Sequence, residues 1–181
     1  MKKILIIQAH NNFEKSLVNK ELISVAKEME NVEIIDIYDR YKGSKVGWMD
    51  KGLISEDRKI AMESDVIVYQ FPFHWYTSPP MLDNWIEWFL GYGWAHGGKY
   101  SLKDKEITVS YTAGEVKSDY TKNGVSLYDS DEFIKRFIAT ANYCQMKWVD
   151  HFKVIGASHL KDGELDLIKK DYKQWLTKIA K

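Results

Sequence analysis

The sequence predicts a doubly wound α/β domain built on an open, five-stranded parallel sheet. Three observations lead to this fold class. Short, continuous apolar runs have the length and composition of strands that are buried on both faces. Segments with apolar residues at three- and four-residue steps alternate with these runs, as amphipathic crossover helices do. Polar loops follow the first, third and fourth predicted strands, at the end of such a sheet where ligands bind.

The first forty residues show the repeating unit. Ile4–Gln8 is the first predicted strand, and residues 9–15 form a polar loop. Apolar residues then recur at helical spacing from Leu17 to Met29, and Val32–Ile37 is the second predicted strand. A strand, a helix and a second strand in this order imply a right-handed crossover and a parallel sheet.

The remaining chain continues this alternation. Residues 39–55 hold glycines among charged side chains, which predicts a loop. The predicted strands cover residues 65–70, 105–111 and 152–155, and the predicted helices cover about 56–64, 79–90, 131–144 and 163–180. In one common doubly wound strand order, the first, third and fourth strands lie side by side. The loops 9–15, 71–78 and 112–130 would then meet at one edge.

Length and composition narrow the class of protein. The 181 residues predict one domain, residues 1–181. Basic and acidic residues cancel, 26 against 26, which gives no electrostatic case for nucleic acid. One cysteine excludes a disulfide framework, and no apolar run approaches the roughly 18 residues of a membrane span. The apolar run after Met1 is too short for a signal peptide, so we expect a soluble, cytoplasmic protein.

The loop after the first strand predicts an anion site. His10, Ser16 and Asn19 flank the start of the first helix, where the backbone of Leu17 and Val18 presents unpaired N–H groups. The alternative is that Ser16 only caps the helix and His10 only ends the strand. The segment has no glycine, so it is neither a Walker A loop nor a dinucleotide fingerprint.

The loop after the third strand is stiff and aromatic. All three prolines of the chain lie between residues 72 and 80, and Phe73, His74, Trp75 and Tyr76 stand between them. Projecting rings on a stiff backbone suit a flat, conjugated ligand. The alternative is an aromatic core cluster beside the sheet.

Residues 71–80, together with the aromatic helix 81–90 and residues 93–97, resemble the flavin-dependent NAD(P)H:quinone oxidoreductase family. This family includes DT-diaphorase-like enzymes and ancillary proteins of bacterial potassium-efflux systems. Its pattern is Phe-Pro-x-x-Trp-(Tyr/Phe), a small residue and Pro, and then an aromatic-rich helix. The resemblance spans about residues 2–180 and implies a flavodoxin-like, three-layer fold.

The resemblance assigns roles to the residues that match the motifs of the family. It implies that the loop after the first strand holds the flavin phosphate, that the aromatic loop carries the isoalloxazine ring, and that the loop after the fourth strand approaches its pyrimidine edge. The matching cofactor-binding residues are His10, Ser16, Leu17, Val18, Asn19, Pro72, Phe73, His74, Trp75, Tyr76, Thr112, Ala113, Gly114 and Tyr120.

Further roles concern proton transfer and substrate. Tyr120 matches a catalytic acid of the family, and Trp94 and His96 match a segment that closes over the substrate, commonly from the partner subunit of a homodimer. This chain departs from the pattern in two places. Glu115 stands where many members have a second glycine, and Ser126 stands near a histidine that assists proton transfer in some members. The helper of Tyr120 is therefore unassigned.

The implied activity is hydride transfer from NAD(P)H through flavin N5 to a quinone, with ping-pong kinetics. The short chain favours FMN over FAD, while NADH and NADPH are both compatible with the sequence. Two alternatives are a regulatory subunit of a potassium-efflux transporter and a reductase of nitro- or azo-aromatic compounds. An electron carrier is disfavoured, because the chain is not acidic and lacks a glycine-rich phosphate loop.

Some residues predict structure alone. His151 and His159 have no partners at metal-ligand spacing, so no metal site is predicted. Cys144 lies on an apolar helical stretch and is expected to be buried. The closing helix carries Tyr172, Trp175 and Ile179 at helical spacing, which is typical of packing against a sheet.

Overall fold

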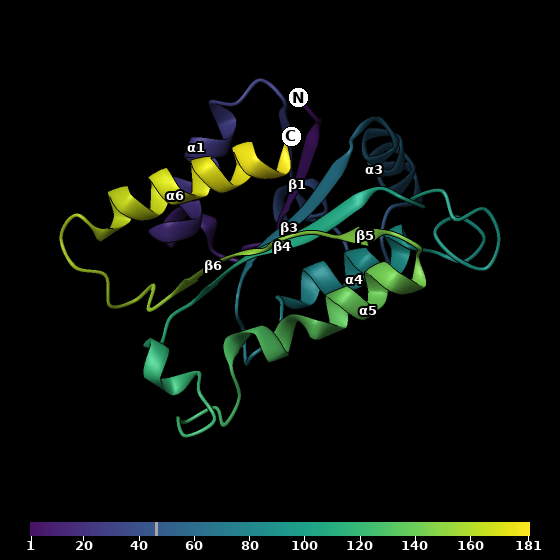
Figure 1. Cartoon of the computed structure of the whole chain (residues 1–181). Helices are drawn as coiled ribbons and strands as arrows, with labels where there is room; N and C mark the ends of the chain where they lie inside the picture. The colour runs from purple at the N-terminus through teal and green to yellow at the C-terminus, as the bar shows by residue number, and fades with distance from the viewer. Residues whose placement is uncertain (46) are drawn as a thin grey trace.

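The computed structural model describes residues 1–45 and 47–181. Its centre is a parallel sheet of strand order β2-β1-β3-β4-β5, and β6 also pairs with β4 (Figure 1). The strands are β1 (Ile4–Gln8), β2 (Val32–Asp36), β3 (Val66–Pro72), β4 (Glu106–Ala113), β5 (Lys147–Trp148) and β6 (Phe152–Ile155). The flavodoxin-like fold predicted from the sequence is confirmed, and β1, β3 and β4 lie side by side as expected.

The fifth position of the sheet holds two short strands where the sequence predicted one. β5 pairs with the start of β4 at Glu106 and Ile107. β6 pairs with its end, from Ser110 to Ala113. The strand that borders β4 is therefore interrupted, and its second half is the predicted segment 152–155.

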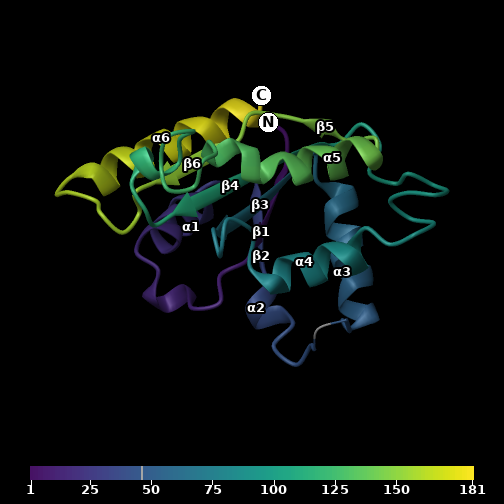
Figure 2. The same ribbon diagram turned by 90° about the horizontal axis from the view of Figure 1, so that it is seen from below.

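Helices cover both faces of the sheet. Helices α1 (Val18–Lys27) and α6 (Glu164–Ile179) lie on one face, and α4 (Pro80–Phe89) and α5 (Lys135–Tyr143) lie on the other (Figures 1 and 2). Two further helices, α2 (Ile37–Arg40) and α3 (Lys51–Glu63), pack on the α4 side. Because both faces are covered, both sets of alternating side chains in β1 are buried, which explains its continuous apolar run.

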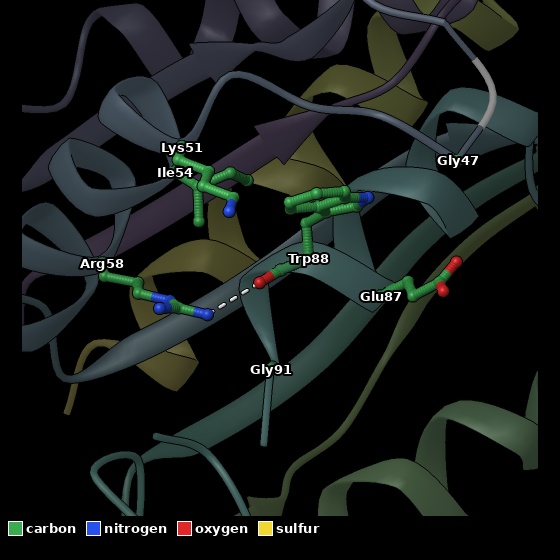
Figure 3. Close-up of a pocket in the computed structure, with 7 residues that line it drawn as sticks. All are labelled: Gly47, Lys51, Ile54, Arg58, Glu87, Trp88 and Gly91. Carbon is green, nitrogen blue, oxygen red and sulfur yellow. Dashed lines mark hydrogen bonds between the residues drawn. The ribbon is translucent and has the colours of Figure 1, made fainter. Parts of the chain in front are cut away.

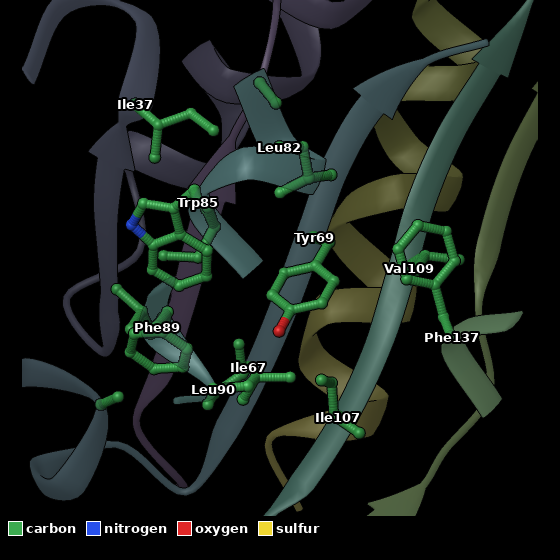
Figure 4. Close-up of a cluster of buried hydrophobic side chains, with 14 of the residues drawn as sticks. Ile37, Ile67, Tyr69, Leu82, Trp85, Phe89, Leu90, Ile107, Val109 and Phe137 are labelled. Carbon is green, nitrogen blue, oxygen red and sulfur yellow. The ribbon is translucent and has the colours of Figure 1, made fainter. Parts of the chain in front are cut away.

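The larger core cluster lies between the sheet and α4. Trp85 and Phe89 of α4 stack with ring centroids 4.1 Å apart, and Tyr69 of β3 meets Trp85 edge-on at 6.1 Å (Figure 4). Phe137 of α5 meets the same tyrosine at 5.9 Å. The aromatic helix 81–90 is thus held against the sheet by ring packing, and this fixes where the preceding loop leaves β3.

The other face carries a second core cluster under α1 and α6. Tyr172, Trp175 and Ile179 are buried there, as the helical pattern predicted. Cys144 is 1% exposed at the end of α5, which confirms its expected burial.

The predicted loop 39–55 is wrong at both ends. Asp36 accepts hydrogen bonds from the backbone N–H groups of Tyr38 and Asp39, and so begins the short helix α2. Asp50 accepts hydrogen bonds from those of Gly52 and Leu53, and so begins α3 at Lys51 and not near residue 56. An aspartate at the N-cap stabilises the start of a helix. In both segments this stabilisation outweighed the preference of charged residues and glycines for a loop.

Other predicted boundaries shift by one to several residues. β3 and β4 each run two residues further than predicted, to Pro72 and Ala113. Pro72 pairs with Thr112 of β4, and Ala113 pairs with Ile155 of β6. The predicted helix 131–144 begins as a 3₁₀ helix, η3 (Ser130–Ile134), and becomes α5 at Lys135. The first predicted loop contains a further 3₁₀ turn, η1 (Phe13–Lys15).

Parallel pairing brings the carboxyl ends of β1, β3, β4 and β6 to one edge of the sheet. The loops that follow these strands lie at this edge. The segment between the end of α4 and the start of β4 lies at the opposite edge, because α4 runs back along the sheet.

Candidate functional site

A cavity of about 470 Å³ opens at the carboxyl edge of the sheet. Loops that are distant in the sequence line it together: those after β1, β3, β4 and β6. The lining residues are His10, Lys15, Ser16, Leu17, Val18, Asn19, Pro72, Phe73, His74, Thr112, Gly114, Ala157 and Ser158. The three loops that the sequence predicted to meet therefore do meet.

One end of the cavity is basic. Among the described residues that line it, Lys15, His10 and His74 carry basic groups and none carries a carboxylate. Helix α1 begins here, and its first N–H groups have no intrahelical acceptors. The Ser16 hydroxyl accepts a hydrogen bond from the Asn19 N–H at 3.2 Å. A helix start beside three basic side chains favours an anion.

The surroundings of His10 disfavour its charged form. Burial lowers its pKa, and the charge of the nearby His74 lowers it further. Its Nδ1 accepts a hydrogen bond from the Asn12 N–H at 3.1 Å, which requires that nitrogen to be unprotonated. An anion in the cavity would oppose both effects, since it favours the charged imidazolium.

Asn19 joins the helix start to the sheet. It is 3% exposed, and its amide nitrogen donates to Thr112 Oγ1 at 2.9 Å. Its Oδ1 is buried and, within the part of the chain that the structure describes, has no hydrogen-bond partner. Buried polar atoms are normally paired, so this oxygen is suited to accept a hydrogen bond from a ligand or an ordered water.

The aromatic loop forms a tight two-residue turn. The backbone groups of His74 and Thr77 exchange hydrogen bonds at 2.8 and 3.1 Å. Trp75 and Tyr76 occupy the turn with φ angles of 50° and 63°. Such a turn normally takes Asn or Gly, because a left-handed backbone is costly for a bulky residue. Strain of this kind gathers at functional sites, and Trp75 is 92% exposed at the tip.

The aromatic loop is only partly a core cluster. Phe73 lines the cavity and stacks on the buried Tyr111 with ring centroids 4.5 Å apart. Tyr76 meets Tyr120 edge-on at 6.2 Å. The buried rings support the loop, while the ring of Trp75 stands free of them.

Tyr120 lies at the border of this cluster, 6.3 Å from Phe73 between ring centroids. Partial burial raises its pKa, and the nearby Tyr76 and Glu115 raise it further. The phenol therefore keeps its proton at neutral pH and is able to donate it. This is the protonation state that a catalytic acid requires.

Ala113 is buried at the end of β4, and its carbonyl oxygen accepts hydrogen bonds from the N–H groups of Gly156 and Ala157. The loop after β6 is thereby held against the loop after β4. This contact places Ala157 and Ser158 in the cavity lining. These two residues and Lys15 line the cavity but were not among the predicted site residues. The rule that ligands bind beyond strand carboxyl ends could have indicated the loop after β6.

Trp94 and His96 do not reach the cavity within one chain. Trp94 packs on Phe89 and beneath the Arg58 guanidinium, 4.6 Å from its ring centroid. His96 lies 5.1 Å from the ring of Tyr143. Both belong to the segment at the opposite edge of the sheet, away from the cavity of their own chain.

A second cavity of about 390 Å³ lies between α3 and α4, lined in part by Lys51, Arg58 and Trp88 (Figure 3). Arg58 donates to the carbonyl oxygens of Trp88 and Phe89 at 2.7 and 3.0 Å. These are among the last carbonyls of α4, which lack intrahelical donors. The arginine therefore serves as a helix cap, and this cavity is built around a structural contact.

Residues 2–179 match the model of a family described as having a flavodoxin-like fold. The chain belongs to this family. The match covers nearly the whole chain, and its description agrees with the parallel sheet and strand order of the structure.

Two relatives illustrate the family. The chain is 32% identical to the uncharacterized NAD(P)H oxidoreductase YrkL of Bacillus subtilis over 164 residues, which cover 90% of this chain and 91% of the relative. It is 30% identical over 176 residues to the glutathione-regulated potassium-efflux system ancillary protein KefG of Pectobacterium atrosepticum, covering 97% and 93% of the two chains.

Solved structures agree in shape. General stress protein 14 of Treponema denticola, in complex with FMN, has a TM-score of 0.85, with 28% identity over 97% of this chain and 98% of that one. A structure described as a thermophilic tryptophan halogenase from Streptomycin violaceusniger has a TM-score of 0.87, with 29% identity over 95% and 97%. The first name states no reaction and the second names a halogenase, so the reaction has to be argued from the site of this chain.

Proposed function

We propose that this protein is an FMN-dependent NAD(P)H oxidoreductase that reduces a quinone or a similar acceptor. The observation that carries the proposal is the cavity, which joins a basic helix start to Pro72, Phe73 and His74. These residues lead directly into the strained turn with the exposed Trp75. An anion site next to an aromatic platform matches a ligand with a phosphate at one end and a flat ring at the other.

The residues present fit such a ligand. The cavity volume of about 470 Å³ lies within the range of about 300–1,000 Å³ that is usual for small-molecule sites. Lys15, His10 and the N–H groups at the start of α1 would hold the phosphate. The unpartnered Oδ1 of Asn19 would accept a hydrogen bond from a hydroxyl group of the ligand. The relative of known structure that binds FMN supports FMN over FAD.

The roles of the chain's residues follow from their positions. When bound in the cavity, FMN would supply the capacity for hydride transfer between NAD(P)H and the acceptor. Trp75 projects from the turn, where its ring can cover a flat substrate or cofactor. The ligand can approach the backbone from Thr112 to Gly114 closely, because Gly114 has no side chain to occupy the cavity wall. Tyr120 holds a proton beside the turn and would donate it to the reduced acceptor. A site shared by donor and acceptor predicts ping-pong kinetics.

The test begins with FMN binding. The purified protein is saturated with FMN, freed of excess, and its visible spectrum is recorded before and after anaerobic NADH or NADPH. We expect bound-flavin bands that bleach with the donor and return with a quinone. Absence of FMN binding would contradict the proposal. Bands that persist with both donors would indicate a flavoprotein fed by another reductant.

We infer that the active form is a homodimer, because Trp94 and His96 lie away from the cavity of their own chain. A cytoplasmic location stays a prediction from the sequence. The test mixes two inactive variants, Tyr120→Phe and Trp94→Ala, after sedimentation has established the oligomeric state. Mixed dimers would regain one complete site if the partner supplies Trp94. A monomer with full activity would contradict the inference.

A second candidate function is regulation of a potassium-efflux transporter. The similarity to KefG, which covers 97% of this chain, favours it. Among the helices of residues 1–45 and 47–181, none is both long and apolar enough to cross a bilayer, so such a role would require association with a membrane partner. Co-purification with a transporter, and a change of ion flux on addition of the protein, would support it.

The remaining alternative is a reductase of nitro- or azo-aromatic compounds. Turnover assays with an azo dye and with a nitro-aromatic compound as acceptors test it.

A further inference from the structure

Phe73, one wall of the cavity, rests on a buried tyrosine. Its ring is nearly parallel to that of Tyr111, at 9° and 4.5 Å between centroids. Tyr111 is fully buried, and its hydroxyl donates to Asp131 Oδ1 at 2.6 Å. The Tyr111 hydroxyl also lies 2.9 Å from Ser130 Oγ, and its oxygen can accept a hydrogen bond from the serine hydroxyl. The ring beneath Phe73 is therefore held in orientation by polar contacts at its far end.

Asp131 is itself anchored by two basic side chains. Lys153 Nζ lies 2.7 and 2.8 Å from its two carboxylate oxygens, and His151 Nε2 lies 3.1 Å from Oδ1. Burial by itself would raise the pKa of Asp131, but hydrogen bonds from Lys153 and Tyr111 hold it below its usual value. Burial and the carboxylate raise the pKa of Tyr111. The pair thus consists of a carboxylate and a protonated phenol, which form a charge-assisted hydrogen bond.

The 3₁₀ helix η3, which contains Asp131, also contacts the aromatic turn directly. Phe133, two residues after Asp131 in η3, stacks on Tyr76 with centroids 4.9 Å apart at 30°. It also meets Phe73 edge-on at 6.1 Å. The two residues of η3 therefore act on both ends of the aromatic turn, Asp131 through Tyr111 and Phe133 directly.

We propose that Tyr111, Asp131 and Phe133 are positioning residues for the aromatic turn, and that they set the orientation in which Phe73, Trp75 and Tyr76 meet the cofactor. This inference rests on the proposed function. The turn carries two bulky residues in the left-handed region, a conformation that persists only where its surroundings enforce it. η3 supplies packing and a buried hydrogen bond at this place. None of the three residues lines the cavity, so each acts through another side chain.

The test is a double-mutant cycle measured on FMN binding. Tyr111→Phe keeps the ring and removes its anchor, and Asp131→Asn keeps an acceptor and removes the charge. We expect Tyr111→Phe to weaken FMN binding roughly three- to tenfold, because the loss of one hydrogen bond has an effect of about that factor. Asp131→Asn should weaken it less, and the double variant no more than Tyr111→Phe alone. The visible circular dichroism of bound FMN should change in each variant.

Tyr41→Phe is the matched control. Tyr41 is also a buried tyrosine that donates to a buried carboxylate, Asp57, at 2.5 Å, but it lies on the α3 side of the core. Its variant should unfold at a lower temperature and keep the wild-type FMN affinity and dichroism. A merely structural role for Tyr111 would give the same result in Tyr111→Phe.

The outcomes separate the two proposals. A wild-type protein that does not bind FMN overturns both. A wild-type protein that binds FMN, together with variants of unchanged affinity and dichroism, overturns only the positioning role. So does a double variant whose loss is the product of the single losses. If Tyr111→Phe does not fold, Phe133→Leu is measured in its place, and wild-type affinity and dichroism there also overturn the inference.

Discussion

The side-chain amide of Asn19 donates a hydrogen bond to Thr112 Oγ1 at 2.9 Å across 93 residues of sequence. Asn19 belongs to the first turn of α1, and Thr112 stands near the end of β4. The bond therefore joins two of the elements that line the cavity, at the point where the helix start meets the sheet. The position of the α1 N-terminus, where an anion would bind, therefore depends on the position of β4.

The first prediction concerns this bond. Thr112→Val removes the acceptor and leaves the Asn19 amide buried without a partner, which should lower the free energy of unfolding by about 1–3 kcal/mol. FMN affinity should fall as well, because Asn19 is then free to turn. Urea unfolding and fluorescence titration with FMN measure the two effects.

Thr108→Val is the control for that prediction. Thr108 is a buried threonine of the same strand, and its hydroxyl donates to the Asp150 carbonyl at 3.0 Å. Its variant should lose stability and keep FMN affinity. Equal affinity losses in Thr112→Val and Thr108→Val would contradict a specific role for the Asn19 bond.

The second prediction concerns the strained turn. Trp75 has a φ of 50°, which glycine adopts without steric cost, so Trp75→Gly should be at least as stable as Trp75→Ala. The exposed Leu167 of α6 is the matched comparison, and there glycine should be less stable than alanine by about 1 kcal/mol. Thermal unfolding of the four variants checks the order. Both Trp75 variants should also bind FMN less tightly, because the exposed ring is lost.

The third prediction is a pH dependence from His10. Its pKa in the folded protein is lowered by burial and by His74, so the unfolded chain binds more protons in the pH range from about 6.5 down to the lowered value. The free energy of unfolding should therefore fall as the pH falls through this range. His10→Asn, which does not titrate there, should show a shallower slope in urea unfolding without FMN. Parallel slopes for the two proteins would exclude His10 as the cause.

The fourth prediction concerns the close approach at Gly114. A Cβ at this position would lie 2.9 Å from Ser158 Oγ, so Gly114→Ala should destabilise the protein by about 1 kcal/mol. This is the low end for overpacking, because Ser158 is exposed and its hydroxyl can turn away. Removing that oxygen should relieve the contact, and the Gly114→Ala, Ser158→Ala double variant should recover stability. FMN affinity should stay reduced in both, because the methyl group remains in the cavity wall. Recovery of affinity together with stability would show that Gly114 matters only for packing.

Much of the fold could be predicted because it depends on local patterns. The buried strands read as apolar runs, and α1, α4 and α6 read as amphipathic helices. The predicted loop 39–55 was wrong because the helices there depend on caps. One aspartate side chain begins each of them, at Asp36 and Asp50, and composition does not reveal that contact.

The candidate site divides in the same way. Motif positions indicated His10, Ser16, Asn19, Phe73 and Thr112, and the structure brings all five to one cavity. The support behind the site was not predictable. Asp131 and Phe133 lie at the start of the predicted helix 131–144, and nothing in their spacing indicates that they contact Tyr111 and Tyr76.

The sequence by itself determined the alternation of strands and helices, the family resemblance and the types of residue that could bind a phosphate and a flat ring. These properties are local, because each is set by periodicity or by a short motif. Only the tertiary structure decided which loops share a cavity, that Trp94 and His96 stand apart from it, and that η3 supports the aromatic turn. Those relationships depend on strand order and on contacts between distant residues, which arise only when the sheet is assembled.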